Sequence, residues 1–272
     1  MKNKIIGIIG FGIVGRAIQA GFYLHADFRI YDKNPINSIN DLETVCRDSE
    51  FIFICVPTPM KKNGEADTSI VEEVIQSCID YVKNTDTILI IKSTIPPGTT
   101  KMLQERHPDI HLVFCPEFLT ARNARLDFIN NARIILGGDK RDTIRVEELF
   151  KTRFPHTPIV HTDSTTAEMV KYTANCFFSV KVSYFNEIYQ ICKKLGLNYE
   201  DVRNMTLMDG RIGNSHTDVP GHDKDFGFGG TCFPKDLNAL ICKSKEIEIK
   251  PSVMIGAWLK NLEVRKKRDW EK

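Results

Sequence analysis

The sequence lacks the features that mark membrane, secreted and nucleic-acid-binding proteins. No run of about 18 apolar residues occurs in its 272 residues, so no membrane-spanning helix is expected. The formal net charge is only +2, which gives no electrostatic reason to expect nucleic acid or an anionic membrane as a partner. The eight cysteines form no C-x-x-C pair, which indicates free thiols in a reducing compartment. We therefore expect a cytoplasmic protein.

Two further absences concern a signal peptide and metal ions. The apolar run from Ile5 to Gly15 is broken by glycines, and no small-residue cleavage site follows it, which argues against a signal peptide. The histidines and aspartates between Ile212 and Asp225 follow no familiar metal-ligand spacing. We expect this segment to be a solvated loop without a metal, with contacts to a substrate as the alternative.

Short apolar runs alternate with helical patterns over roughly the first 160 residues. The runs are Ile5–Ile9, Phe28–Tyr31, Phe51–Val56, Thr87–Ile91, His111–Cys115, Ala132–Leu136 and Ile159–His161, and the helical patterns include Val14–Phe22, Ser69–Val82, Thr99–Glu105 and Arg141–Phe150. Because the runs stay apolar on consecutive positions, they are typical of strands buried on both faces of a parallel sheet. The alternation predicts a doubly wound, Rossmann-type α/β domain over residues 1–163.

A different pattern begins after residue 163. Thr165 and Glu168 have the spacing of a capping box, which predicts a helix that runs to about Leu195 and stops at Gly196. This helix is apolar on more than one face, so it must be buried between layers or against another subunit. We expect residues 164–272 to form this central helix and a small helical dimerisation domain, with a homodimer made through residues 165–195.

The remainder of this half is expected to be helical apart from one long loop. Asn198–Met208 predicts a short helix, and a polar loop follows from Asp209 to Gly230. The last helix is predicted from Ser252 to about Lys267. The basic run Arg265-Lys266-Lys267-Arg268 would then form its solvated end, where cations suit the helix dipole.

A glycine fingerprint lies between the first predicted strand and helix. Gly10-Phe11-Gly12-Ile13-Val14-Gly15 has the G-x-G-x-x-G form, in which the glycines make the turn, admit a pyrophosphate and let the helix pack on the strand. Asp32 ends the second predicted strand and would accept hydrogen bonds from a ribose. This favours NAD over NADP, although Lys33 beside it weakens the discrimination.

A second informative segment surrounds Cys232. Gly229 and Gly230 precede the thiol, Lys235 follows three residues later, and Asp236 follows four residues later. If a helix opens at this point, its N-terminus and the lysine would both favour the thiolate. The segment therefore predicts a covalent nucleophile. A buried cysteine after a flexible turn is the alternative.

Several segments together resemble the UDP-glucose 6-dehydrogenase and GDP-mannose dehydrogenase group of nucleotide-sugar dehydrogenases. They follow the order usual in that family and cover nearly the whole chain. They are Gly10–Gly15, Cys55-Val56-Pro57-Thr58-Pro59, Lys92-Ser93-Thr94-Ile95-Pro96-Pro97-Gly98-Thr99, Pro116-Glu117-Phe118-Leu119, Glu168-x-x-Lys171-x-x-x-Asn175, Asn186-Glu187, Arg211-Ile212-Gly213 and Gly229–Asp236. The resemblance implies NAD as the cofactor and a nucleotide sugar, most closely UDP-glucose, as the substrate.

The resemblance also implies a covalent mechanism. Cys232 would attack an aldehyde to give a thiohemiacetal, which is then oxidised to a thioester and hydrolysed. Lys171 and Asn175 would stabilise the alkoxide or oxyanion, and Asp236 would activate water or take protons. Lys171 and Asn175 are four residues apart on one predicted helix and share a face. A lysine that only snorkels to solvent is the alternative for Lys171.

The family pattern assigns the remaining site residues. Glu117 resembles the family residue that acts in the hydrolysis step, and Thr94 resembles the one that positions water. The alternatives are a carboxylate that only caps its loop for Glu117, and a hydroxyl that only forms part of a turn for Thr94. Cofactor contacts are implied for Gly10, Gly12, Ile13, Val14, Gly15, Asp32, Lys33, Val56, Pro57, Thr58, Thr94, Glu117 and Lys235, and substrate contacts for Phe118, Leu119, Lys171, Asn175, Arg211 and Gly229.

The sequence departs from the family in two ways. Thr120-Ala121-Arg122-Asn123 replaces a basic residue followed by Glu-Gly, so Ala121 cannot act as the family glutamate. Family members also continue into another α/β domain that binds the nucleotide half of the substrate, whereas this sequence stops at Lys272. A truncated chain, a natural short form that uses a dimer partner or a separate chain, and a cofactor-binding remnant all fit this length.

Three functions follow from these features. The first is NAD-dependent, four-electron oxidation of the C6 hydroxyl of a nucleotide sugar through Cys232. The second is a non-catalytic or partner-dependent NAD-binding module. The third is a two-electron dehydrogenase of the hydroxyacid type, which shares the glycine fingerprint and the lysine–asparagine helix but does not need the Gly-Gly-x-Cys segment.

Overall fold

The computed structural model describes residues 4–271, which pack as two compact units. Unit 1 contains the chain up to Thr58 together with Asp67–Lys171, and unit 2 contains Pro59–Ala66 and the residues from Tyr172 onward. A domain boundary after residue 163 stays a prediction.

Unit 1 contains a seven-stranded sheet in the order β2-β1-β3-β4-β5-β6-β7. The strands are β1 (Lys4–Ile9), β2 (Ala26–Tyr31), β3 (Phe51–Ile54), β4 (Ile88–Ile91), β5 (His111–Phe114), β6 (Ile134–Gly138) and β7 (Ile159–Thr162). Each corresponds to a predicted run. The first five strands are parallel, whereas β6 is antiparallel to β5 and β7 is parallel to β6. The Rossmann-type fold is confirmed, with a sheet that is mostly rather than wholly parallel.

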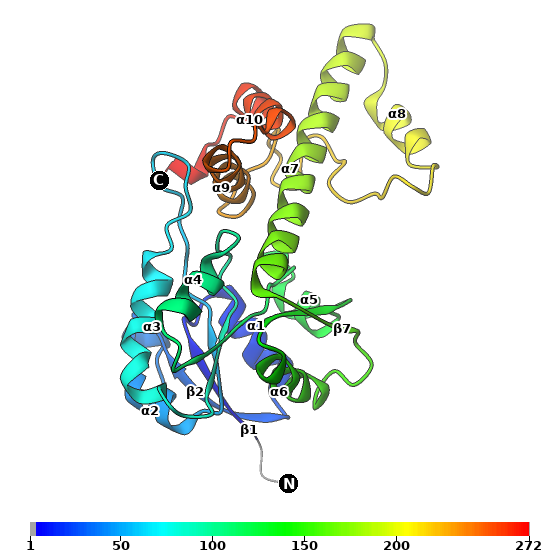
Figure 1. Ribbon diagram of the computed structural model, residues 1–272. Helices are drawn as coiled ribbons and strands as arrows, with labels where there is room; N and C mark the ends of the chain where they lie inside the picture. Colours follow the sequence, from blue (N-terminus) through cyan, green and yellow to red (C-terminus); the bar gives the residue numbers. More distant parts are fainter. Residues whose placement is uncertain (1–3, 272) are drawn as a thin grey trace. The chain divides into compact units, whose positions relative to one another are not determined.

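Helices cover both faces of this sheet, as Figure 1 shows. One face packs against α1 (Ile13–Phe22), α5 (Ala124–Ile129) and α6 (Lys140–Lys151), and the other against α2 (Leu42–Asp48), α3 (Ser69–Val82) and α4 (Thr99–Arg106). The central strands β3 and β4 are buried at every residue, which explains their unbroken apolar sequence. The predictions missed the short α2 and α5, because neither is long enough to show a clear helical period.

The long helix α7 (Ser164–Leu195) begins differently from the prediction. Asp163 forms its cap, because its carboxylate accepts from both the N–H and the hydroxyl of Thr166 at 2.9 and 2.6 Å. The predicted capping box of Thr165 and Glu168 is therefore wrong. Glu168 is fully buried and instead accepts from Gly98 N–H, Thr100 N–H and Thr100 Oγ1 at 2.6–2.8 Å. It thus caps α4, a helix distant in sequence.

Burial gives Glu168 an unusual ionisation. Removal from water raises its pKa to about 7, and the negative charge of Asp163 acts in the same direction. The hydrogen bonds from Thr100 and Gly98 lower this pKa, but burial has the larger effect. The folded protein therefore binds this proton more tightly than the unfolded chain does. Between pH 4.5 and 7 its contribution to stability falls as pH rises, by on the order of 3 kcal/mol in total.

A Glu168→Gln variant is expected to lose this pH dependence. Because glutamine cannot ionise, the free energy of unfolding of the variant should decline less than that of the parent protein between pH 5 and 8. The variant also loses hydrogen bonds to α4, so the parent should be the more stable at pH 5, with the difference shrinking as pH rises. Urea unfolding at several pH values measures this. Parallel stability curves for the two proteins would show that Glu168 does not titrate in this range.

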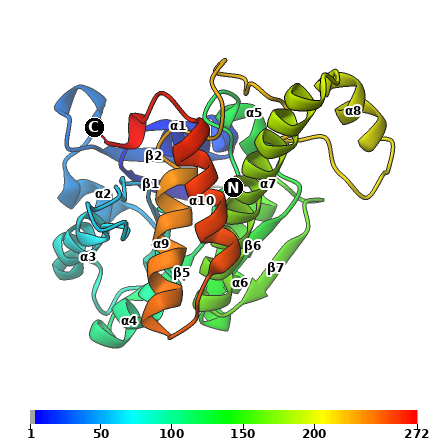
Figure 2. The same ribbon diagram turned by 90° about the horizontal axis from the view of Figure 1, so that it is seen from above.

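Unit 2 is helical. It contains the rest of α7, followed by α8 (Tyr199–Thr206), α9 (Phe233–Glu246) and α10 (Ser252–Val264), of which α9 and α10 lie side by side in Figure 2. The segment Pro59–Ala66 also packs here, because Ala66 joins the apolar core of α7 and α9 and Asn63 O accepts from Cys242 Sγ at 3.5 Å. Among the described residues no helix is both long and apolar enough to cross a membrane.

The basic run after α10 does not form a solvated helix end as predicted. α10 ends at Val264, and the side chain of Arg265 is only 1% exposed. It forms an ion pair with Asp223 at 2.6 Å and lies 3.6 Å from Asp225. The loop before the glycine bend is therefore not wholly solvated either, since Thr217 and Val219 in it are also buried. A short 3-10 helix, η2 (Asp269–Glu271), follows.

Candidate active site

The glycine loop joins β1 to α1, and its three glycines are needed for different reasons. Gly10 has φ +92°, and a Cβ there would lie 2.7 Å from Cys55 O. At Gly15 a Cβ would lie 2.4 Å from Gly10 O, whereas at Gly12 it would meet nothing within 4 Å. The first and third glycines therefore serve the fold. The second leaves open space above the loop, at the start of a helix, where backbone N–H groups attract a phosphate.

Asp32 at the end of β2 supports the same loop. Its Oδ2 accepts from Phe11 N–H at 2.6 Å, and its Oδ1 accepts from Asn34 N–H at 2.8 Å. Lys33 is exposed, and Ile13 is 56% exposed at the first position of α1. The carboxylate thus lies next to the glycine loop, and its predicted bond to a ribose stays a prediction.

The loops after β3 and β4 complete this edge of unit 1. Thr58 Oγ1 donates to Thr94 O at 2.9 Å, and Ser93 Oγ donates to Val56 O at 2.6 Å. The chain order reverses between β1 and β3, which makes this edge the topological switch point where open α/β sheets bind ligands. The shape of the glycine loop and its neighbours therefore fits a dinucleotide such as NAD.

Substitutions at Gly12 and Gly15 separate binding from folding. Gly12→Ala is expected to leave the unfolding free energy unchanged but to weaken NAD binding at least about tenfold, because its methyl occupies the open space. Gly15→Ala is expected to lower stability by about 1–3 kcal/mol, since the helix must move off the strand. Calorimetric titration with NAD and urea unfolding measure the two effects. Unchanged NAD affinity in Gly12→Ala would contradict the assignment.

A buried ion pair lies on unit 1 beside this edge. Lys171 is 3% exposed, and its Nζ donates to Glu117 Oε1 at 2.8 Å and lies 5.6 Å from the ring centre of Phe118. Burial acts to raise the pKa of Glu117, but the ion pair with Lys171 and the hydrogen bond from Leu119 N–H outweigh it and hold that pKa below its usual value. The snorkelling alternative for Lys171 is therefore wrong. Glu117 caps its own loop and also pairs with the lysine.

Lys92 is a second buried cation to which the sequence analysis gave no role. It is 3% exposed at the end of β4, and its Nζ donates to Pro116 O at 2.9 Å and to Cys115 Sγ at 3.4 Å. Its charge also lowers the pKa of Glu117. Lys92 therefore holds the segment that carries Glu117. Its sequence signal was a lysine directly after a fully apolar strand.

Unit 2 contains a second polar cluster around Asp236. This carboxylate is 1% exposed, accepts from Asn175 Nδ2 at 2.6 Å and pairs with Lys235. Asn175 follows Lys171 by one turn of α7. The structure thus joins Lys171 to Glu117 in unit 1, and joins Asn175 to Asp236 and Lys235 in unit 2. Their predicted action on one substrate stays a prediction.

Cys232 lies at the N-cap of α9 and is exposed. The helix predicted after the glycine bend is therefore confirmed, and the alternative of a buried cysteine is wrong. Most other cysteines are buried, and burial raises the pKa of the Cys115 and Cys176 thiols. Among the cysteines in the described part of the chain, Cys232 is the one that combines high exposure with a helix N-terminus, the setting of reactive thiols.

Arg211 lies in unit 2, between α8 and α9. Its side chain is 90% exposed and pairs with Asp209 at 2.6 Å. Its predicted contact with substrate, and those of Phe118, Leu119 and Gly229, stay predictions.

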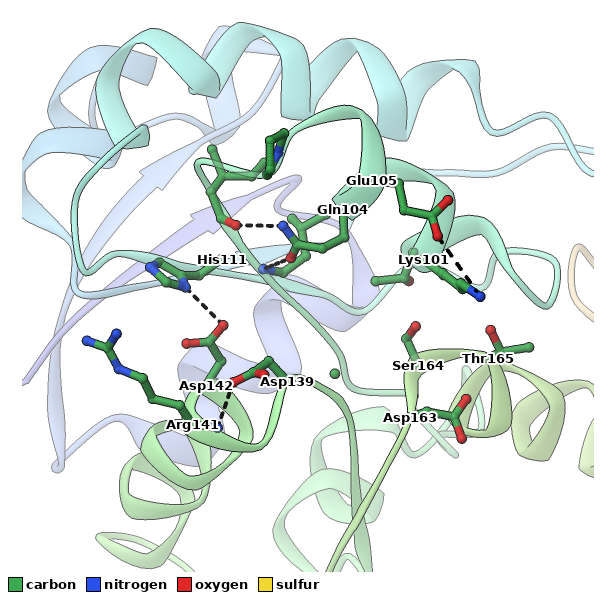
Figure 3. Close-up of a pocket in the computed structure, with 15 residues that line it drawn as sticks. Lys101, Gln104, Glu105, His111, Asp139, Arg141, Asp142, Asp163, Ser164 and Thr165 are labelled. Atoms are coloured by element: carbon green, nitrogen blue, oxygen red, sulfur yellow. Dashed lines mark hydrogen bonds and ion pairs between the residues drawn. The ribbon is translucent and has the colours of Figure 1, made fainter.

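A polar cavity of about 480 Å³ lies elsewhere on unit 1 (Figure 3). It is lined by the start of β5 and the end of the antiparallel β6, which lie away from the glycine loop at the carboxyl end of β1. Its polar groups bind one another: Gln104 bonds to Ile110 O and Leu112 N–H, and His111 Nδ1 lies 2.9 Å from Asp142. None of the predicted site residues lines it, so we do not include it in the active site.

Comparison with known proteins identifies the family. The NAD-binding domain model of the UDP-glucose/GDP-mannose dehydrogenase family matches residues 28–153, and the central domain model of that family matches residues 165–261. The fold and the glycine loop define a dinucleotide-binding protein of the Rossmann type. The chain belongs to the UDP-glucose/GDP-mannose dehydrogenase family, and its first half contains that family's NAD-binding domain.

Curated relatives are considerably longer. UDP-glucose 6-dehydrogenase TuaD of Bacillus subtilis (strain 168) is 34% identical over 209 residues, which are 74% of this chain and 44% of the relative. UDP-glucose 6-dehydrogenase of Rickettsia bellii (strain RML369-C) is 35% identical over 214 residues, 75% of this chain and 48% of the relative. The chain spans about half the length of these relatives.

Solved structures confirm the fold. A UDP-glucose dehydrogenase from Pyrobaculum islandicum aligns with a TM-score of 0.84 at 24% identity, over 96% of this chain and 68% of that one. A 3-hydroxyisobutyrate dehydrogenase from Mycobacterium tuberculosis aligns with a TM-score of 0.79 at 15% identity, over 99% of this chain and 97% of that one. Both likenesses concern the fold alone.

Proposed function

We propose that this chain carries the NAD-dependent chemistry of a nucleotide-sugar 6-dehydrogenase, with UDP-glucose as the substrate. The observation that carries this proposal is the exposed Cys232 at the N-terminus of α9, directly after a glycine bend. A two-electron alcohol dehydrogenase has no need of such a thiol. The family match supports NAD as the cofactor, and the UDP-glucose 6-dehydrogenase relatives support the sugar nucleotide.

The proposed reaction oxidises the C6 alcohol to a carboxylate at the thiol of Cys232. NAD, when bound, supplies the hydride acceptor for each of two oxidations. After the first, the Cys232 thiolate adds to the aldehyde carbon and the carbonyl oxygen takes a proton, which gives a thiohemiacetal. Loss of a hydride from that carbon and of the proton from its hydroxyl group forms the C=O bond of a thioester. Water then adds, the C–S bond breaks and the acid leaves, so four electrons are removed and the thiol is restored.

The two buried clusters supply the remaining chemistry in this proposal. The ammonium of Lys171 and the amide of Asn175 stabilise the negative oxygen that forms when the thiolate or water adds. Asp236 takes protons or activates water, and Glu117 and Thr94 position the hydrolytic water. Lys171, Asn175 and Asp236 are buried, and the side chain of Glu117 is 12% exposed. Hydrogen bonds hold all four, so their orientation is fixed before substrate arrives.

A homodimer through α7 is part of the proposal. Phe177, Tyr184 and Ile191 recur every seven residues along that helix and are 60, 59 and 48% exposed, with Leu195 at 67% four residues on. An apolar stripe of this kind favours burial against a second copy. We also propose a cytoplasmic location, which the free thiols of the described residues support.

Counting NADH per sugar tests the function. The chain is incubated with NAD and UDP-glucose or GDP-mannose, and NADH and the sugar acid are quantified. Two NADH per sugar consumed supports the proposal, whereas one per substrate would support a two-electron dehydrogenase. NAD binding without turnover, restored by a second chain, would support a partner-dependent module. No turnover of any nucleotide sugar under either condition would overturn the proposal.

A further inference from the structure

The glycine bend before Cys232 is held by side chains that follow it by more than thirty residues. Asn261 on α10 is fully buried, and its amide makes two bonds to one residue: Oδ1 accepts from Phe228 N–H at 2.7 Å and Nδ2 donates to Phe228 O at 3.0 Å. Gly227 beside it has φ +65°, and a Cβ there would lie 2.2 Å from Asn261 Oδ1. The bend and Asn261 therefore fit each other closely.

Arg265 continues these contacts one step along the bend. A Cβ at Gly229 would lie 2.2 Å from its Nη2, so the guanidinium packs directly on the glycine. The same guanidinium donates to Phe226 O at 3.4 Å and forms the ion pair with Asp223. A charge this deeply buried costs several kcal/mol unless it is paired. The pairing therefore holds the loop, the bend and the arginine in one arrangement.

Asp269 makes the third contact. Its Oδ1 accepts from Gly230 N–H at 3.0 Å, and its Oδ2 lies 3.8 Å from Arg265 Nη2. Asn261, Arg265 and Asp269 are thus spaced four residues apart, and they contact successive residues of the bend from Phe228 to Gly230. The next residues are Thr231 and Cys232, the N-cap of α9.

We propose that Asn261, Arg265 and Asp269 form a latch that fixes the bend Gly227–Gly230 and thereby positions the thiol of Cys232. The three are positioning residues, because they act on the thiol through the bend that they contact. The latch holds Cys232 where the helix N-terminus favours its thiolate and where the bend leaves it exposed. Its effect on turnover rests on the function proposed above, whereas its effects on the bend and on the thiol do not.

The test compares Asp269→Ala with the matched variant Glu271→Ala in the full chain. Asp269 is chosen because it is 25% exposed, so its loss leaves the buried Arg265 paired with Asp223 and the fold intact. Glu271 lies two residues on and pairs with the exposed Arg268, away from the bend. Asp269→Asn is a rescue variant, since it keeps an acceptor for Gly230 N–H. Thermal unfolding confirms that all three variants are folded.

Three measurements follow. In Asp269→Ala, hydrogen exchange of the Gly227–Cys232 segment is expected to rise about tenfold, and alkylation of Cys232 by iodoacetamide is expected to slow about threefold. With NAD and UDP-glucose, kcat should fall about tenfold while the KM for NAD stays within about twofold. Asp269→Asn should recover most of each loss, and Glu271→Ala should match the parent protein.

The outcomes separate the latch from the proposed function. Unchanged exchange and alkylation in Asp269→Ala would overturn the latch, as would equal changes in Glu271→Ala. Faster exchange with unchanged alkylation would also overturn it, because the bend would then not position the thiol. If the parent protein turns over no nucleotide sugar, the proposed function fails, and the exchange and alkylation results together then decide the latch.

Discussion

Replacing Cys232 by serine is expected to lower turnover of the nucleotide sugar at least about 10³-fold. A serine hydroxyl is close in size to the thiol, but at neutral pH it is neither ionised nor a good leaving group. The aldehyde would then not be held as a thiohemiacetal, and no thioester would form. NADH release measured by absorbance, together with quantified sugar acid, checks this. NAD affinity should not change, because Cys232 is not among the residues expected to contact the cofactor.

Cys242→Ser is the matched control for this variant. Cys242 lies on the same helix α9, is half-buried and donates from Sγ to Asn63 O at 3.5 Å. Its loss should leave turnover within about twofold, because a hydroxyl can make the same bond. Full activity in Cys232→Ser would remove the covalent mechanism and favour direct oxidation.

Replacing Lys171 by methionine is expected to lower the free energy of unfolding by about 3–5 kcal/mol. The substitution removes the ammonium 2.8 Å from Glu117 and leaves a carboxylate that is only 12% exposed. Lys92 lowers the pKa of Glu117 through its charge but forms no ion pair with it. The buried carboxylate must therefore remain unpaired or take up a proton. Urea unfolding at pH 7 measures the loss.

The double variant Lys171→Met/Glu117→Gln separates charge from packing. With both charges removed, the protein should regain at least half of the lost stability, because no unpaired charge stays buried. Lys243→Met is the surface control: it breaks an exposed pair with Glu246 and should change stability by less than about 0.5 kcal/mol. A double variant as unstable as Lys171→Met would show that packing, not charge, makes Lys171 important.

Local patterns in the sequence were enough to predict the α/β unit. Strands such as β3 and β4 are apolar at every position, and that pattern arises only when both faces of a strand are buried. The glycine loop was equally predictable, because Gly10 needs a positive φ and Gly15 needs the absence of a Cβ. These constraints act between residues that are close in the chain or lie along one strand. They can therefore be recognised in the sequence.

The failures occurred where a residue's partner lies far away in the sequence. Glu168 has the spacing of a capping box, yet it caps α4, about seventy residues earlier. Arg265 stands in a basic run typical of a solvated helix end, yet it is buried against Asp223 and the glycine bend. The role of Lys92 was not predicted, because its partner Pro116 O lies in the loop after β5, 24 residues later. The spacing of residues within one segment cannot show which distant group pairs with a charged side chain.

The sequence by itself therefore determined the class of fold, the cofactor loop and the presence of a thiol on a glycine bend. Each depends on backbone freedom or on periodic burial, which are properties of neighbouring residues. Only the tertiary structure decided how the buried cations distant from their partners are paired: Lys171 with Glu117, and Arg265 with Asp223. Burial makes an unpaired charge costly, so folding selects these partners by position in space and not by distance along the chain.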